Sequence, residues 1–235
     1  MSNTGFNFSK FLDDSRMALL KPKEYFTSMS TTGGFVEPLI KAVIYGFVAG
    51  IFIFIWSLLN IGAAGGLGSM FGGAIGIMVF IWSVIGAVIG LFIGGVIVLI
   101  ISAICGGSTE FEANVRVVAS LMVLTPISAL FGFLAGFSGL LSTLVSLVIN
   151  LYGIWMLYHA LNESLKAKPA TSKIVSIILA ALLALTVVVG AFTKKAATES
   201  INRYQDMIEE MTTEEEEEAE EAEEAEEAEE AEERP

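Results

Sequence analysis

The longest stretches without a charged side chain set the tightest limit on how this chain can fold. Residues 42–109, 117–162 and 174–193 contain no Asp, Glu, Lys or Arg. A helix of about 20 apolar residues crosses the hydrocarbon core of a bilayer, which is about 30 Å thick. In a soluble domain about a quarter of all residues are charged, so stretches of this length have no stable place in water. We therefore expect an all-α membrane protein whose main partner is the lipid bilayer.

The lengths of these stretches predict a bundle of about five transmembrane helices. The last stretch fits one crossing, and the middle one fits two, with an interruption between Gly132 and Gly139. The first stretch fits two or three crossings, and seven glycines from Gly62 to Gly76 favour a turn after the first of them. The predicted helices are 42–61, 77–101, 117–136, 140–159 and 174–193.

The distribution of Lys and Arg predicts the orientation. With the N-terminus in the cytoplasm, five spans place nine basic residues on the cytoplasmic side and three near the membrane on the other side. Six spans would place eight basic residues on the cytoplasmic side and four on the other side. Cytoplasmic loops normally carry the excess of Lys and Arg, which favours five spans. We expect a cytoplasmic N-terminal segment (1–40), a transmembrane domain (41–193) and an acidic C-terminal tail (194–235), with six spans as the alternative.

Most of the negative charge lies in the tail. Residues 206–235 hold eighteen of the twenty-six acidic residues, and outside them the chain carries twelve basic and eight acidic residues. This basic body suits a protein that meets anionic lipid headgroups. Glu side chains three and four residues apart repel each other on a helix, so we expect a disordered or loosely helical tail. Two functions of the tail are open: it could keep the protein soluble, or it could bind cations or basic partners.

Apolar residues at helical spacing predict a short amphipathic helix near the N-terminus. Phe8, Phe11, Leu12 and Leu19 alternate with charged residues, and Pro22 ends the pattern. Such a helix lies either on the cytoplasmic membrane surface or against the loops of the bundle, and both placements are open.

Small residues at four-residue spacing predict close helix packing. In lipid no hydrophobic effect draws helices together, and glycines on one face let two backbones approach and gain dispersion contacts. The predicted packing residues are Gly46, Gly50, Gly86, Gly90, Gly94, Gly132 and Gly136. The three in the second span are in register and indicate a packing centre, either within the chain or between copies in a homo-oligomer.

Two polar features belong to the predicted helices. Asn150 lies deep in the fourth span and predicts a hydrogen bond to another helix. The segment from Thr109 to Glu112 has the form of a capping box, which predicts the start of the third helix.

The sequence offers no defensible catalytic, cofactor or metal site, and we expect a non-enzyme without cofactors. Ser138 lies in a Gly-x-Ser-Gly segment, but the single histidine, His159, follows 21 residues later on the same predicted helix. Along a helix this separation is about 31 Å, too far for a catalytic pair. The single cysteine, Cys105, excludes a disulfide or cysteine zinc site and is expected to be a buried apolar residue. Phosphate-binding loops and basic nucleic-acid patches are not recognisable either, so no nucleic-acid partner is expected.

The order of several short motifs resembles the Yip domain family, five-span membrane proteins named for binding Ypt/Rab-type GTPases in eukaryotes and also widespread in prokaryotes. The motifs are Pro22–Phe26, Gly33–Phe35 before Pro38, Gly106–Gly107 before Phe111, Val115–Val118 around Arg116, then Pro126, and Tyr152 with Trp155 and Leu161–Glu163. The resemblance implies a cytoplasmic N-terminus. The acidic tail departs from the family pattern, and a long N-terminal region like that of the GTPase-binding members is not recognised. These departures favour a prokaryotic member in the plasma membrane; a eukaryotic member would lie in the ER or Golgi membrane.

These observations together predict a non-enzymatic scaffold or adaptor in membrane organisation or trafficking. It would act through helix–helix association and through an unidentified cytoplasmic or membrane protein partner. The alternative is a permease or channel-like component for a small solute or lipid. The predicted spans contain no ionisable residue except His159 at a boundary, which argues against a transport path for ions or protons.

Overall fold

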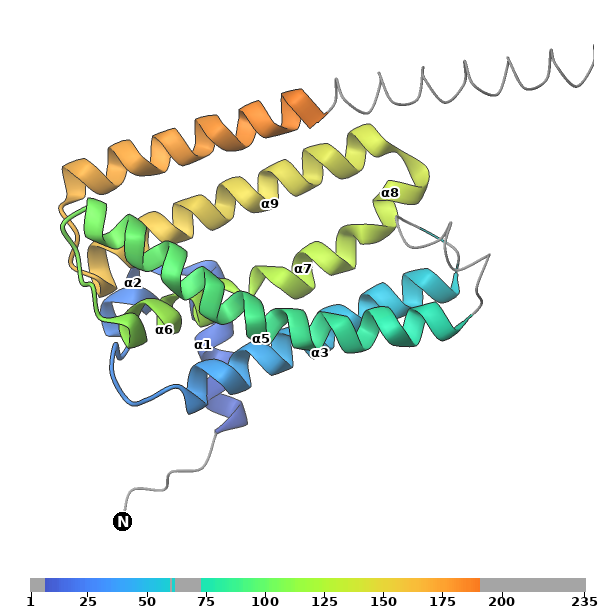
Figure 1. Cartoon of the computed structure of the whole chain (residues 1–235), viewed down its shortest axis with the longest axis horizontal. Helices are drawn as coiled ribbons and strands as arrows, with labels where there is room; N and C mark the ends of the chain where they lie inside the picture. Colours follow the sequence, from blue (N-terminus) through green and yellow to red (C-terminus); the bar gives the residue numbers. More distant parts are fainter. Residues whose placement is uncertain (1–6, 60, 62–72, 191–235) are drawn as a thin grey trace, which may run out of the picture. The chain divides into compact units, whose positions relative to one another are not determined.

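The computed structural model describes residues 7–59, 61 and 73–190, and all regular secondary structure in these residues is helical (Figure 1). The elements are α1 (Phe8–Leu20), α2 (Pro22–Ser28), α3 (Val36–Leu58), α5 (Gly73–Ile104), α6 (Phe111–Leu121), α7 (Leu124–Leu130), the 3-10 helix η1 (Phe131–Phe133), α8 (Leu134–Phe137), α9 (Gly139–His159), the π-helix η2 (Ala160–Ser164) and a last helix (Pro169–Gly190). Residues up to Ala184 form one compact unit, in which all the contacts below lie. Of the second unit, Leu185–Pro235, only the helical residues up to Gly190 are described.

Five helical segments are long and apolar enough to cross a bilayer, as predicted. They comprise 22 to 28 residues each, against the roughly 20 that a crossing needs. The segments are Val36–Leu58, Ile77–Ile104, Phe111–Phe137, Gly139–Ser164 and Pro169–Gly190. The protein is therefore an all-α, multi-pass membrane protein. Most of the glycine-rich turn predicted after the first span and the whole acidic tail lie outside the described residues.

The helices begin before the predicted spans. The first begins at Val36 rather than 42 and the last at Pro169 rather than 174, while the third begins at Phe111, close to the predicted capping segment and six residues before the predicted span. The prediction began these spans after the last charged residue. The first and third helices include the charged residues Lys41 and Arg116 within their first two turns, because these side chains have partners there, as described below.

The third span is not one continuous helix. α6 ends at Leu121, a turn at Met122 and Val123 follows, and α7 begins at Leu124. Pro126 lies in the first turn of α7, where a missing backbone N–H is tolerated. The predicted interruption near Gly132–Gly139 is also present, where α8 gives way to α9.

α3 and α5 pack closely because two glycines of α3 face α5. An ideal Cβ built on Gly46 would lie 2.6 Å from the Cβ of Ala87, and one built on Gly50 would collide with Ser83 and Phe80. Ser83 Oγ also donates a hydrogen bond of 3.0 Å to the Gly46 carbonyl. Only a glycine surface allows this approach of the two backbones.

The other predicted packing glycines lie in different surroundings. Gly94 faces α6, with Val118 Cγ1 2.9 Å from its ideal Cβ, whereas nothing lies within 4 Å of the positions for Gly86 and Gly90. Gly132 approaches Trp56 at 3.6 Å, and Gly136 is exposed in α8. Part of the glycine register in α5 is therefore used inside the chain, and part is open.

The buried core is concentrated at one end of the long helices, where α1, α2 and α6 gather (Figure 1). Its fully buried side chains include Phe26 of α2, Val115 and Val117 of α6, and Leu161 and Leu165 near η2. The long helices instead expose large apolar side chains, as expected of surfaces that face lipid.

The contact between α3 and α5 predicts a strong effect of a larger residue at Gly46. Gly46→Leu should destabilise the protein by about 1–3 kcal/mol, because the new side chain cannot fit without moving α5. The matched control, Val43→Leu, enlarges an exposed residue of the same helix and should change little. The thermal midpoint of the detergent-purified protein measures both, and an unchanged midpoint for Gly46→Leu would exclude this packing.

Candidate functional site

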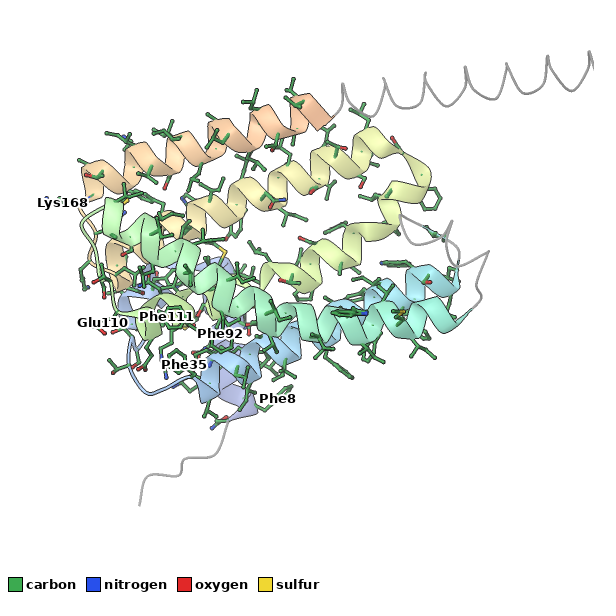
Figure 2. The ribbon with its side chains drawn as sticks, in the orientation of Figure 1. Phe8, Phe35, Phe92, Glu110, Phe111 and Lys168 are labelled. Atoms are coloured by element: carbon green, nitrogen blue, oxygen red, sulfur yellow. The ribbon has the colours of Figure 1, made fainter. Side chains whose placement is uncertain are left out.

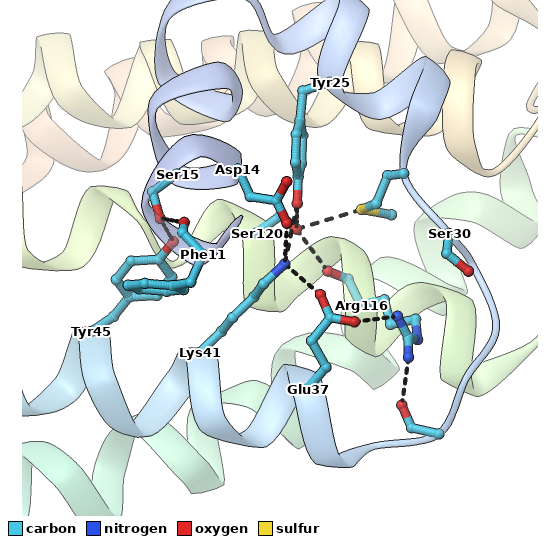
Figure 3. A network of polar contacts seen from close by, with 12 residues as sticks. Phe11, Asp14, Ser15, Tyr25, Ser30, Glu37, Lys41, Tyr45, Arg116 and Ser120 are labelled. Carbon is cyan, nitrogen blue, oxygen red and sulfur yellow. Dashed lines mark hydrogen bonds and ion pairs between the residues drawn. The ribbon is translucent and has the colours of Figure 1, made fainter. Parts of the chain in front are cut away.

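Two buried cations lie at the end of the bundle where α1, α2 and α6 meet the start of α3. Lys41 of α3 is only 6% exposed and Arg116 of α6 only 7%. A buried charge is costly unless it is paired and hydrogen-bonded, so the partners of these two side chains decide what they do. Their partners lie on α1, α2, α3, α6 and the loop before α3, and Figure 3 shows how Glu37 lies between the two cations.

Lys41 joins α1 and α2 to α3. Its Nζ lies 2.9 Å from Oε1 of Glu37, one turn earlier on α3, and 3.5 Å from Oδ2 of Asp14 on α1. It also donates to the hydroxyl of Tyr25 on α2 at 3.4 Å. The Tyr25 hydroxyl in turn lies 2.8 Å from Oγ of Ser120 on α6. All three ammonium hydrogens of Lys41 therefore have an acceptor within reach.

Arg116 joins the loop before α3 to α6. Its Nη1 lies 3.1 Å from Oε2 of Glu37, and its Nε donates to Oε1 of Glu112 at 3.3 Å. Its Nη2 donates to the Gly34 carbonyl at 3.0 Å, while Gly34 N–H donates to Glu112 at 2.6 Å. Both glycines of this loop have positive φ, and an ideal Cβ on Gly33 would lie 2.7 Å from Nη2 of Arg116. Glycine is needed at Gly33 because a side chain there would displace the guanidinium group.

We call Asp14, Glu37, Lys41, Glu112 and Arg116 the polar clasp. Glu37 is its centre, because one oxygen of this carboxylate faces Lys41 and the other faces Arg116. The clasp contains three carboxylates and two cations, and each cation has at least two acidic partners. Its chemistry is that of a structural tie between α1, α3, α6 and the loop at Gly34.

A small cavity of about 80 Å³ lies beside the clasp, lined among others by Ser28, Ser30 and Met29. Small-molecule pockets usually enclose about 300–1,000 Å³, and a water molecule occupies about 30 Å³. The cavity therefore has room for a few waters and not for a metabolite. Among the described residues, no cluster of His, Cys, Asp and Glu has the arrangement of a metal site.

The predicted motif at Gly106–Gly107 forms a second tie at the same end. Gly106 has φ +68°, and an ideal Cβ on Gly107 would lie 2.9 Å from the carbonyl oxygen of Leu165. Ser108 N–H donates to that carbonyl at 2.7 Å, and Lys168 N–H donates to the Cys105 carbonyl at 3.0 Å. The loop after α5 is thus fastened to the loop after η2.

The capping box predicted at the start of α6 is not formed. The helix begins at Phe111, near the expected place, but Glu110 is the cap residue and no side chain caps it. The carboxylate of Glu112 is engaged by Gly34 and Arg116 instead. The charge-assisted bonds to these two partners outweigh a bond to a single backbone N–H.

Aromatic contacts connect the same end of the bundle. Phe111 lies 5.9 Å from Phe35, which lies 6.2 Å from Phe92 of α5, measured between ring centroids (Figure 2). The hydroxyl of Tyr152 donates to the Leu19 carbonyl at the end of α1. Through Phe35, these ring contacts link Phe111 of the predicted motif to α5 and to the loop before α3.

Other predicted residues are placed as follows. Asn150 donates to the carbonyl of Ser146 in its own helix at 2.8 Å, and an interhelical contact for it stays a prediction. Ser138 caps the N-terminus of α9 and His159 ends that helix, so the separation that argued against a catalytic pair is confirmed.

Cys105 is fully buried and unpaired by disulfide, as predicted for a small apolar residue. Burial raises the pKa of its thiol, because the thiolate would be poorly solvated. The reactive form is therefore scarce at neutral pH.

Sequence reasoning missed the clasp except for Arg116, which was selected only as part of a motif. The predicted spans themselves contain no Asp, Glu, Lys or Arg, but the helices are longer than the predicted spans: α3 also contains Glu37 and Lys41, and α6 also contains Glu112 and Arg116. A signal was present in both segments: an acid precedes a base by four residues, the spacing of a salt bridge on one helix face.

Comparison with known protein families gives a match over most of the chain. The family model of the Yip1 domain matches residues 17–191, which include Arg116, both glycine loops and the five apolar helices. No curated protein and no solved structure matched the chain.

The clasp predicts unequal effects of removing two lysines. Lys41→Gln should destabilise the protein by about 1–3 kcal/mol, because it leaves the partly buried Asp14 without its cationic partner and takes one of two cationic partners from Glu37. Lys21→Gln is the matched control: this ion pair to Glu24 is 62% exposed on both sides and should be worth at most about 1 kcal/mol.

Thermal unfolding in detergent, followed by circular dichroism, measures both lysine variants. Equal midpoints for Lys41→Gln and Lys21→Gln would show that the clasp does not hold this end of the bundle together.

Proposed function

The chain belongs to the Yip1 domain family, and from this premise we propose that it is a non-enzymatic scaffold or adaptor in membrane organisation or trafficking. It would act by association of its helices, between copies or with another membrane protein. It would lie in a cell membrane with its N-terminus in the cytoplasm. The polar clasp supports a non-enzymatic role, because its charged groups are occupied by one another.

One observation carries the proposal of helix association. α5 uses some of its small residues within the chain, with Ala87 against Gly46 and Gly94 against Val118, while Gly86 and Gly90 have nothing within 4 Å. The two open glycines lie four residues apart on a helix whose exposed surface otherwise carries large apolar side chains, mostly isoleucines. A second helix could approach this face as closely as α3 approaches the other.

The association predicts a defined response to bulky residues. Gly86→Leu combined with Gly90→Leu should shift the protein from oligomer to monomer, because the leucines keep a second backbone away. Ile85→Leu, which conserves volume on the same exposed surface, should leave the oligomer intact. Single-molecule photobleaching of labelled protein in lipid bilayers measures the number of copies. A wild-type protein that is monomeric and captures no other membrane protein would contradict the proposal.

The topology can be tested separately. With five spans and a cytoplasmic N-terminus, a reporter fused after Arg203 should lie on the side opposite the cytoplasm. A paired alkaline phosphatase and green fluorescent protein fusion at this site distinguishes the sides, since each reporter is active on one side only. A reporter fused after Lys168 should give the reverse result. Fluorescence from the fusion after Arg203 would contradict the five-span topology.

A further inference from the structure

We propose that α1 is an in-plane interfacial helix: one edge inserts into the leaflet around the start of α3, and Arg16 binds lipid phosphate at its rim. The ligand class is a phospholipid surface, with anionic headgroups preferred. The proposal concerns α1 alone and does not depend on association through α5.

The contacts of α1 with α3 show which edge lies deeper. Asp14 pairs with Lys41, whereas Ser15 lies 2.7 Å from the hydroxyl of Tyr45 and Phe11 stacks on the same ring at 5.2 Å between centroids. Tyr45 lies one turn, about 6 Å, further along α3 than Lys41. Rotation around the axis of α1 from Asp14 to Ser15 therefore leads away from the start of α3 and toward the hydrocarbon core.

The residues that follow in this rotation are apolar. At about 100° per residue, Phe8, Leu19 and Leu12 lie about 20°, 40° and 60° beyond Ser15 around the helix. Leu19 packs partly on the core, while Phe8 is 58% and Leu12 51% exposed. The deep edge of α1 thus presents two large apolar side chains that no described residue covers.

A lipid occupant fits this edge better than a protein. Phe8 lies 5.9 Å from Phe11, which stacks on Tyr45, so the apolar edge continues the surface of a membrane-spanning helix. A bilayer that surrounds α3 as far as Tyr45 also surrounds this edge. Tyr45 lies nine residues, or about 14 Å, along α3 from Val36, within the segment that is long and apolar enough to cross a bilayer.

The charges on α1 and α2 fit anionic headgroups. Lys10, Arg16, Lys21 and Lys23 are exposed, against the exposed carboxylates Asp13 and Glu24. Around the axis of α1, Arg16 lies about 40° beyond Leu12, so it lies at the rim of the deep edge. In the described part of the chain it makes no ion pair. A basic residue near an anionic membrane surface contributes about 1 kcal/mol to binding.

The experiment uses the full chain in liposomes, with spin labels at single cysteines. In a Cys105→Ala background, Leu12→Cys probes the deep edge and Met17→Cys probes an exposed apolar position about 140° away around the helix. Oxygen concentrates in lipid and a nickel chelate stays in water. We expect the label at 12 to collide several-fold more often with oxygen than with nickel, and the label at 17 to show the reverse.

Each other outcome would overturn the proposal. Nickel access at 12 equal to that at 17 would place the edge in water. A label at 12 that neither reagent reaches would indicate a protein partner, and loss of that protection on dilution with unlabelled chains would identify a second copy. Association through α5 would be unaffected by any of these results.

The lipid class is tested with the same label. Adding phosphatidylglycerol to phosphatidylcholine vesicles should raise the oxygen-to-nickel ratio at 12, and Arg16→Gln should clearly reduce that rise. Lys173→Gln, which removes an exposed cation from the last helix, is the matched control and should leave the rise unchanged. A rise of the same size in Arg16→Gln would remove Arg16 from the lipid contact.

Discussion

The fold depends most directly on one carboxylate, that of Glu37, which faces two buried cations from different elements. Charges removed from water are costly, and their attraction offsets this cost only when every member of the group is in place. Lys41 and Arg116 each need Glu37, and each also takes a second carboxylate from another segment or turn. α1, α3, α6 and the glycine loop are therefore stable in their observed arrangement together, and none of them is satisfied alone. This mutual dependence fixes one end of the bundle.

The rest of the molecule is suited to lipid, rather than water, as its solvent. Where the helices leave the clasp, their large apolar side chains are exposed, and close contact occurs where glycine permits it, as between Gly46 and α5. Burial of apolar surface stabilises the end at which α1, α2 and α6 pack together, but it supplies little between helices that lipid surrounds. The polar ties accordingly gather at the end of the bundle that holds α1 and α2, and the glycine contacts lie further along α3 and α5.

The same division explains what the sequence could and could not predict. The number of spans follows from charge-free length, since lipid excludes unpaired charge wherever it lies. The starts of α3 and α6 do not follow from charge-free length, although the Thr109–Glu112 segment marked the start of α6. Lys41 and Arg116 lie within these helices because they have partners that are distant in sequence, such as Asp14 for Lys41 and Gly34 for Arg116. The pairs Glu37–Lys41 and Glu112–Arg116, each four residues apart, were visible in the sequence. Their burial, however, depends on the distant partners, which the spacing does not reveal. The break at Met122 likewise has only Pro126 as a local signal, and that proline marked the region without locating the turn.

The clasp also bears on how α1 could act on a membrane. A helix of 13 residues is marginal in water on its own, and many amphipathic segments fold only when they bind lipid. In this protein Asp14, Phe11 and Ser15 hold α1 on α3, and Tyr152 holds its end, so the helix is already ordered. Binding to lipid would then cost no folding free energy, and the depth of insertion would be set by α3 rather than by the helix itself. Weakening the clasp should consequently change where α1 lies before it changes whether the bundle spans the membrane.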